Sequence, residues 1–159
     1  MTFKQTILTE SQMRKCAIAL SNKISSLTKG QDLVLVARCA RARILALDIA
    51  KTIKMLEDKP VMVVDFDRVD NDFVVSNKTT IILVEDVFYT GRSASDCVDK
   101  LRNAKAARVE LASFICTNKN DLPYDYHHVA MRIELGAGEI VALSVKPVDV
   151  KNAVEIYSL

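Results

Sequence analysis

The sequence predicts an α/β fold with a doubly wound, mostly parallel sheet flanked by helices. Two observations support this prediction. Compact apolar runs of strand length alternate with amphipathic runs of helix length along most of the chain. This alternation is typical of parallel sheets with right-handed crossovers. The apolar run from Ile81 to Val84 is continuous rather than alternating, as in strands that are covered on both faces.

The chain opens with a predicted helix. Thr9 and Gln12 form a capping-box pattern, apolar residues then recur at helical spacing, and Gly30 ends the run. A compact apolar strand is predicted over residues 33–37. A second amphipathic helix, with its apolar stripe over residues 44–56, ends before a proline. The strand, the turn after it and the second helix form a strand-turn-helix unit.

The same alternation continues through the middle of the chain. We predict strands over residues 61–64 and 81–85, a helix over residues 92–105 and a further strand over residues 109–116. The helix would bury its small and aliphatic side chains against the sheet. These segments complete the parallel part of the predicted fold.

The C-terminal third is less regular. We expect short strands over residues 129–133 and 140–145, around a turn that contains Gly136 and Gly138. A final edge strand is expected over residues 154–157. The predicted fold also includes a small hood beside the main sheet.

Length and composition bound the class of protein. The chain has 159 residues, half of them apolar, which suits one well-packed domain over residues 1–159. The net charge is only +2, so the protein as a whole has no positive field strong enough to attract polyanions. Any contact with nucleic acid therefore needs a local basic patch. No apolar run approaches the roughly 20 residues that span a bilayer. The four cysteines are widely separated, without a Cys-x-x-Cys pair, which favours reduced thiols and a cytoplasmic location.

The segment from Ile81 to Ser93 carries the chemistry that the sequence indicates. Its strand ends in Glu85 and Asp86 and runs into a Thr-Gly turn that opens a helix. Ligands of open α/β sheets bind at this edge. Carboxylates accept hydrogen bonds from hydroxyl groups, and backbone N–H groups at a helix N-terminus bind anions. A sugar phosphate presents both groups, although a strand-to-helix turn can also carry Asp, Thr and Gly only as cap residues.

This segment resembles the signature of type I phosphoribosyltransferases, which bind 5-phosphoribosyl-1-pyrophosphate (PRPP). Four apolar residues, two acids and a Thr-Gly-x-Ser loop carry the resemblance. It implies that Glu85 and Asp86 hold the ribose 2- and 3-hydroxyls and act in catalysis, while Tyr89 to Ser93 cradle the 5-phosphate. The substrate-binding residues that it implies are Val87, Phe88, Tyr89, Thr90, Gly91, Arg92, Ser93, Ala40 and Ala42.

A second turn follows the strand over residues 33–37 and is expected at the same edge of the sheet. It contains Arg38 and Arg41, and bidentate guanidinium groups suit a pyrophosphate leaving group. The resemblance implies that Arg41 matches the arginine of the family that binds pyrophosphate. This chain has Ala37 and Ala42 where the family often has glycine. The alternative is that both arginines are solvated at a helix start.

Over the whole chain, the sequence most resembles the pyrimidine-operon attenuator proteins that also have uracil phosphoribosyltransferase activity. Tyr89 stands where hypoxanthine-guanine enzymes have an aspartate, and a phenol with an ordinary pKa of about 10 is a poor general base. The resemblance therefore implies a pyrimidine base, with uracil preferred; Tyr89 as a packing ring over the loop is the alternative. The segments that carry this resemblance are the helix start at Ile7 to Lys15, the Ala40 to Ala42 turn, the Phe88 to Arg92 loop, the Asp121 to Pro123 turn and the Val154 to Tyr157 end.

Two features of the resemblance concern activity and partners. The attenuator group inserts a long β-arm that closes over the substrate, whereas this chain has only residues 61–78 there, including Arg68. A short lid implies weak or absent catalysis because lids exclude water. The alternative is a non-catalytic regulator that senses PRPP or a nucleotide and binds RNA or a protein partner.

The resemblance further implies Mg²⁺ held mainly by the pyrophosphate of the substrate, without a protein metal cage, and a homodimer. Residues 121–128 occupy the position from which the family's hood presents groups to the base. We expect the adjacent His127 and His128 at the surface or in the hood.

Overall fold

The computed structural model describes residues 1–119 and 127–159. It contains a five-stranded sheet with the order β3-β2-β4-β5-β6 and a three-stranded sheet with the order β1-β8-β7. The elements are β1 (Thr2–Leu8), α1 (Glu10–Leu27), β2 (Asp32–Ala37), α2 (Ala40–Glu57), β3 (Met62–Asp65), the 3-10 helix η1 (Phe66–Arg68), β4 (Thr79–Phe88), α3 (Arg92–Leu101), the 3-10 helix η2 (Arg102–Ala104), β5 (Arg108–Thr117), β6 (His127–Ile133), β7 (Glu139–Ser144) and β8 (Ala153–Ser158).

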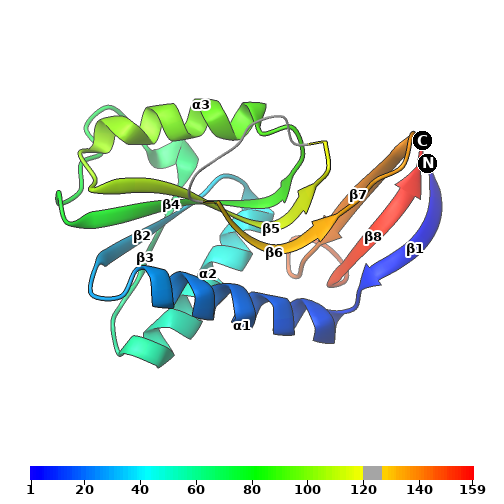
Figure 1. The fold of residues 1–159 in the computed structure, drawn as a ribbon, viewed down its shortest axis with the longest axis horizontal. Coiled ribbons are helices and arrows are strands. Elements are labelled where there is room, and N and C mark those ends of the chain that lie inside the picture. Colours follow the sequence, from blue (N-terminus) through cyan, green and yellow to red (C-terminus); the bar gives the residue numbers. More distant parts are fainter. Residues whose placement is uncertain (120–126) are drawn as a thin grey trace.

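The five-stranded sheet is parallel throughout and is covered on both faces, as the continuous apolar run at Ile81 to Val84 predicts. Helices α1 and α2 lie against one face and α3 against the other (Figure 1). Leu35 and Ile82 belong to the core on the side of α1 and α2, whereas Leu83 belongs to the core under α3. The predicted α/β class and its doubly wound arrangement are confirmed.

The capping box at Thr9 sets the start of α1. The backbone N–H of Thr9 donates to the side chain of Gln12 at 2.9 Å, so α1 begins at Glu10 as the pattern predicts. The predicted helix over residues 92–105 is shorter in the structure. It ends at Leu101, continues as η2 and meets Lys105 in the left-handed region, with φ of 61°.

The small antiparallel sheet forms the hood beside the carboxyl ends of the parallel strands. The sequence does not predict its strand β1. Residues 2–6 show no apolar alternation, because all of them are exposed in the structure. The expectation of a final edge strand is wrong. Strand β8 lies between β1 and β7, and it is the central strand of the hood because the N-terminal segment folds back to pair with it.

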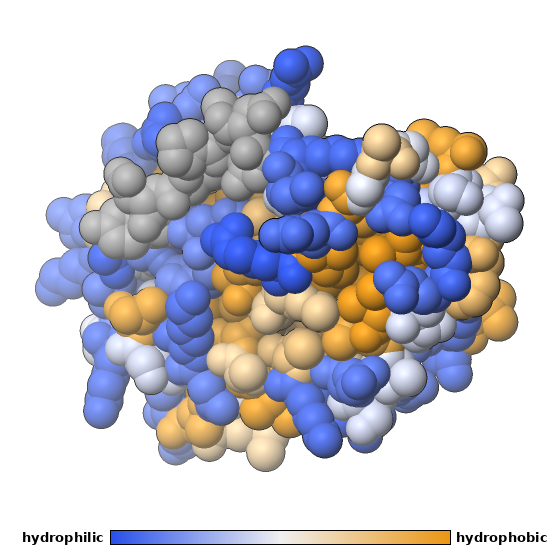
Figure 2. Space-filling view, turned by 45° about the vertical axis from the view of Figure 1, so that its right-hand side comes forward, coloured by the Kyte–Doolittle hydropathy of each residue, from blue (hydrophilic) through white to orange (hydrophobic). Residues whose placement is uncertain are grey.

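Figure 2 shows the side of the molecule that carries the hood. Hydrophobic residues gather in the middle of this face, with hydrophilic residues around them. Both chain ends lie together at the far end of the hood (Figure 1), where Thr2 pairs with Ser158. Within the described residues, no helix combines the length and the apolar character that crossing a membrane requires.

Candidate active site

The pairing of β2 with β4 brings the two predicted turns together. Ala37 is the partner of Val84 in this parallel pair, and the backbone N–H of Arg38 donates to the carbonyl of Val84 at 3.2 Å. The turn after β2 therefore lies beside Glu85 and Asp86 at the carboxyl edge of the sheet. The sequence predicts this juxtaposition, and the structure confirms it.

Glu85 is buried and faces Arg38. Its Oε1 lies 2.6 Å from Arg38 Nε, and the side chain of Glu85 is only 5% exposed, against 33% for Arg38. The two atoms touch as an ion pair without hydrogen-bond alignment. Burial raises the pKa of Glu85 to about 7, and Asp86 adds to the rise while Arg38 opposes it. Near neutral pH, Glu85 is therefore protonated more readily than an ordinary carboxyl group.

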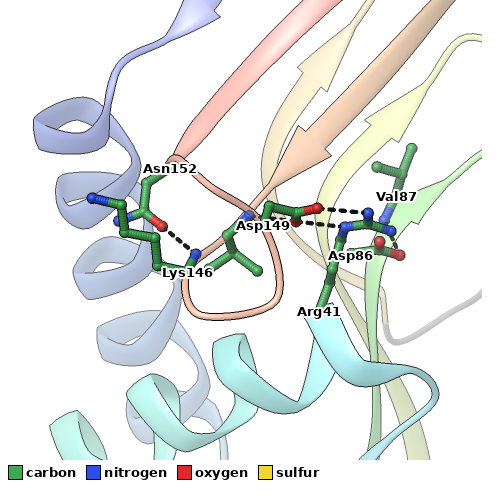
Figure 3. A network of polar contacts seen from close by, with 7 residues as sticks. Arg41, Asp86, Val87, Lys146, Asp149 and Asn152 are labelled. Atoms are coloured by element: carbon green, nitrogen blue, oxygen red, sulfur yellow. Dashed lines mark hydrogen bonds and ion pairs between the residues drawn. The ribbon is translucent and has the colours of Figure 1, made fainter.

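Asp86 has different surroundings, since neighbouring residues of a strand point to opposite faces. One oxygen of its half-buried side chain accepts the backbone N–H of Val87 at 2.8 Å. Figure 3 shows Asp86 beside the guanidinium of Arg41. The side chains of Glu85 and Asp86 therefore point from β4 toward two different arginines. Only Asp86 is accessible while the ion pair between Arg38 and Glu85 is closed.

Arg41, in the first turn of α2, forms a bidentate ion pair with Asp149 (Figure 3). Its Nε donates to Oδ2 at 2.8 Å and its Nη2 donates to Oδ1 at 2.9 Å. These bonds lower the pKa of Asp149 and raise that of Arg41. The sequence places Arg41 at this edge correctly but gives no sign of its partner.

The loop after β4 requires glycine at position 91. Gly91 has φ of +80°, and a Cβ there would lie 2.6 Å from the ring of Phe88. Gly91 is also the N-cap of α3, whose first turn contains the exposed residues Arg92 and Ser93. The first N–H groups of a helix have no partner within it, so this loop can donate to an anion beside the partly exposed Thr90.

Tyr89 connects the same loop to the hood through two hydrogen bonds. Its hydroxyl donates to the carbonyl of Val141 at 2.6 Å and accepts the backbone N–H of Val141 at 2.9 Å. Burial raises the pKa of this phenol. Both hydrogen-bonding roles of the hydroxyl are used by β7, so Tyr89 has no capacity left for base catalysis in this conformation, and its ring packs against the core.

The other predicted binding residues differ in access. Val87 and Phe88 are the last residues of β4 rather than loop residues. Phe88 is buried, and its ring contacts that of His127 at a tilt of 60°, with ring centroids 4.6 Å apart. Ala40 is exposed at the start of α2, whereas Ala42 is fully buried. Only backbone groups of Phe88 and Ala42 are therefore available to a ligand here.

Cys39 lies between Arg38 and the start of α2 and is half-buried. Burial raises the pKa of its thiol, and thiolates rather than thiols are the reactive form. The structure therefore supports an inert thiol in this turn.

The expectation that the two histidines lie at the surface or in the hood is wrong, because both lie on β6 of the five-stranded sheet. His128 is buried on β6 and lies 2.6 Å from Glu110, while His127 hydrogen-bonds Ser113 at 2.8 Å. Burial lowers the pKa of His127 to about 4. Both residues belong to the parallel sheet, because β6 begins at His127. The Asp121 to Pro123 turn lies outside the described residues.

The segment between β3 and β4 packs down on the sheet. Phe73 and Val75 contact the core under α3, and the backbone N–H of Val75 donates to Ala104 at 3.0 Å. The side chain of Asp70 caps a turn by accepting the backbone N–H of Asp72 at 3.0 Å. Over residues 66–78 the described chain therefore forms no strand-built arm over the edge of the sheet.

A groove of about 450 Å³ lies elsewhere, between α1 and α2. Met13, Ile18, Ile44 and Met55 contribute to its walls. It contains none of the acids or loop residues described above, so it is not our candidate for the active site.

Comparison with known proteins identifies the class. No family model matches the chain. Solved structures of the same fold include a hypoxanthine-guanine phosphoribosyltransferase of Bacillus anthracis, with a TM-score of 0.76, 15% identity and 99% of each chain covered. The hypoxanthine phosphoribosyltransferase of Trypanosoma cruzi gives a TM-score of 0.78 and 13% identity over 98% of this chain and 97% of that one. The fold is that of the type I phosphoribosyltransferases.

Sequence relatives narrow the class. The bifunctional protein PyrR of Clostridium beijerinckii is 30% identical over 176 aligned positions that cover 99% of each chain. The PyrR of Thermus aquaticus is 29% identical, over 99% of this chain and 97% of that protein. The chain belongs to the family of the bifunctional PyrR proteins, which are type I phosphoribosyltransferases.

Proposed function

We propose that the chain transfers the phosphoribosyl group of PRPP to a nucleobase, with uracil as the acceptor. The observation that carries this proposal is the meeting, at one sheet edge, of a carboxylate, an arginine and a glycine-capped helix start. They are Asp86, Arg41 and the loop at Gly91. A ribose, a pyrophosphate and a phosphate need these three groups in this order.

The residues divide the work. The loop from Tyr89 to Ser93 anchors the 5-phosphate. Asp86 accepts hydrogen bonds from the ribose hydroxyls, and Glu85 joins it when its ion pair with Arg38 opens. Both carboxylates stabilise the positive charge that develops at the anomeric carbon. As the carbon–oxygen bond to pyrophosphate breaks, Arg41 stabilises the departing oxygens. The ring nitrogen of uracil then bonds to that carbon and loses its proton to water.

Mg²⁺ fits this edge as a partner of the substrate. Asp86 offers a hard oxygen ligand, and within the described residues no group of three or more metal-ligating side chains lies together. When bound, the ion would neutralise charge on the pyrophosphate. We therefore propose that substrate oxygens and water supply most of its ligands.

Pyrophosphate release tests the proposal. Protein incubated with Mg²⁺, PRPP and a panel of bases should release pyrophosphate with uracil in preference to purines. Asp86→Asn should lower the rate by about 100-fold or more, because it removes charge stabilisation in the transition state. Asp99→Asn makes the same charge change in an exposed ion pair of α3 and should leave the rate unchanged. Turnover by Asp86→Asn at the wild-type rate would contradict the assignment.

A second candidate is a regulator that binds PRPP or a nucleotide without turnover and has RNA as a partner. The packing of residues 66–78 on the sheet favours it, since a developing cation unprotected by a lid reacts with water. PRPP would then raise the unfolding temperature without pyrophosphate release. RNA affinity that falls steeply with salt concentration would support this role.

We also propose a cytoplasmic location, supported by four cysteines that all remain thiols in the structure. A homodimer is proposed on the family resemblance. Sedimentation of the purified protein at the mass of one chain would contradict it.

A further inference from the structure

Arg41 needs a partner if it is to hold one orientation. Its side chain is 41% exposed, and that of Asp149 is 20% exposed. An arginine this exposed has many rotamers in water, and ordering it costs free energy. The two hydrogen bonds to Asp149, at 2.8 and 2.9 Å, fix the guanidinium plane as well as its position. A single contact would fix only the position.

Asp149 is itself held by its own turn (Figure 3). Its Oδ2 accepts the backbone N–H of Val145 at 2.9 Å, and its backbone N–H donates to the carbonyl of Val145 at 2.8 Å. The backbone N–H of Lys146 donates to Asn152 at 2.7 Å. The loop between β7 and β8 therefore presents the carboxylate in a fixed place.

The geometry leaves the other edge of the guanidinium for a ligand. Asp149 accepts hydrogen bonds from the N–H of Nε and from one N–H of Nη2. A guanidinium has five N–H groups, so three remain: one on Nη2 and two on Nη1. Arg41 lies beside Asp86 (Figure 3), at the edge where the phosphates of the substrate would lie.

We propose that Asp149 is a positioning residue that aims Arg41 at the pyrophosphate group of the substrate. This inference rests on the proposed function. A carboxylate near a phosphate also repels it, but here both carboxylate oxygens are already engaged by donors: Arg41 reaches both, and Val145 reaches one of them. These donors offset part of the negative charge of Asp149 and so reduce its repulsion of the phosphates.

Calorimetric titration of three ligands tests this role: Mg-pyrophosphate, Mg-PRPP and ribose 5-phosphate. Asp149→Asn should weaken binding of the first two by about fivefold, the size of one exposed charge-assisted contact. Binding of ribose 5-phosphate should not change, because its phosphate contacts the Gly91 loop. Asp99→Asn adds the same net charge far from this edge and should change none of the three.

A double-mutant cycle separates positioning from a structural role. In an Arg41→Ala background, Asp149→Asn should have no further effect on pyrophosphate binding. Equal losses for all three ligands, or the same loss without Arg41, would show that the change disturbs the loop instead. Tighter pyrophosphate binding by Asp149→Asn would mean that Asp149 competes for Arg41, which also overturns the role.

The wild-type protein distinguishes this inference from the function beneath it. If it binds PRPP and Asp149→Asn binds it equally well, the role of Asp149 is wrong and the proposed function stands. If the wild-type protein binds neither PRPP nor ribose 5-phosphate, the proposed function fails and the role of Asp149 fails with it.

Discussion

Arg38 and Arg41 belong to one turn, yet they form ion pairs in two regions that differ in exposure to water. The partner of Arg38 is Glu85, inside the sheet and 5% exposed. The partner of Arg41 is Asp149, on the hood loop and 20% exposed, and Arg41 itself is 41% exposed. Both pairs join the turn to another element at under 3 Å. Burial, rather than distance, therefore distinguishes them.

The difference in burial implies different roles. A buried carboxylate that loses its partner keeps an uncompensated charge, which is strongly destabilising. An exposed pair contributes about 0–1 kcal/mol, because water replaces most of what is lost. We therefore expect loss of Arg38 to destabilise the fold, and the pair of Arg41 to act mainly on ligand orientation.

The largest effect is expected from Arg38→Met. At about pH 8 this change should lower the free energy of unfolding by roughly 3 kcal/mol, since Glu85 is then left buried without its counter-charge. The loss should be smaller at about pH 5.5, where Glu85 is protonated and needs no partner. Urea unfolding at both pH values measures it.

Arg102→Met is the matched control for this change. It breaks an exposed pair with Asp99 and should cost under about 1 kcal/mol at either pH. An Arg38→Met variant as stable as the wild type at about pH 8 would show that burial does not distinguish the two regions.

A smaller effect is expected from pH alone. The pKa of Glu85 is raised from 4.5 to about 7 on folding, so the folded state binds the proton more tightly than the unfolded state. The resulting stability is complete below pH 4.5 and is lost as the pH rises through 7. We expect the contribution of Glu85 to fall by about 2 kcal/mol between roughly pH 5.5 and 8. Glu85→Gln should flatten this part of the profile; an unchanged profile in that variant would assign it to other groups.

The smallest effect on stability is expected at the exposed pair. Asp149→Asn should lower the free energy of unfolding by about 0.5 kcal/mol, and about 1 M salt should remove most of the difference by screening. Thermal unfolding at low and high salt measures it. A loss above about 2 kcal/mol that persists in salt would mean that this pair is structural, like that of Arg38.

Local sequence patterns determined much of the fold and the position of the site. The continuous apolar run ending at Val84 specifies a buried parallel strand, and the Thr9 capping box specifies a helix start. The Thr-Gly pair ending at position 91 indicates a turn between a strand and a helix, and glycine permits the positive φ found there. Each of these signals involves residues within about one turn or strand of one another. Short-range interactions of this kind can therefore be predicted from the order of the residues.

Only the tertiary structure decided which groups meet. Asp149 reaches Arg41 across 108 residues and Val141 reaches Tyr89 across 52, and β1 becomes a hood strand through pairing with β8. The burial of His128 on β6 is decided in the same way. These contacts leave no periodic trace in the sequence, because packing between distant elements sets the partner and the exposure of each charged group.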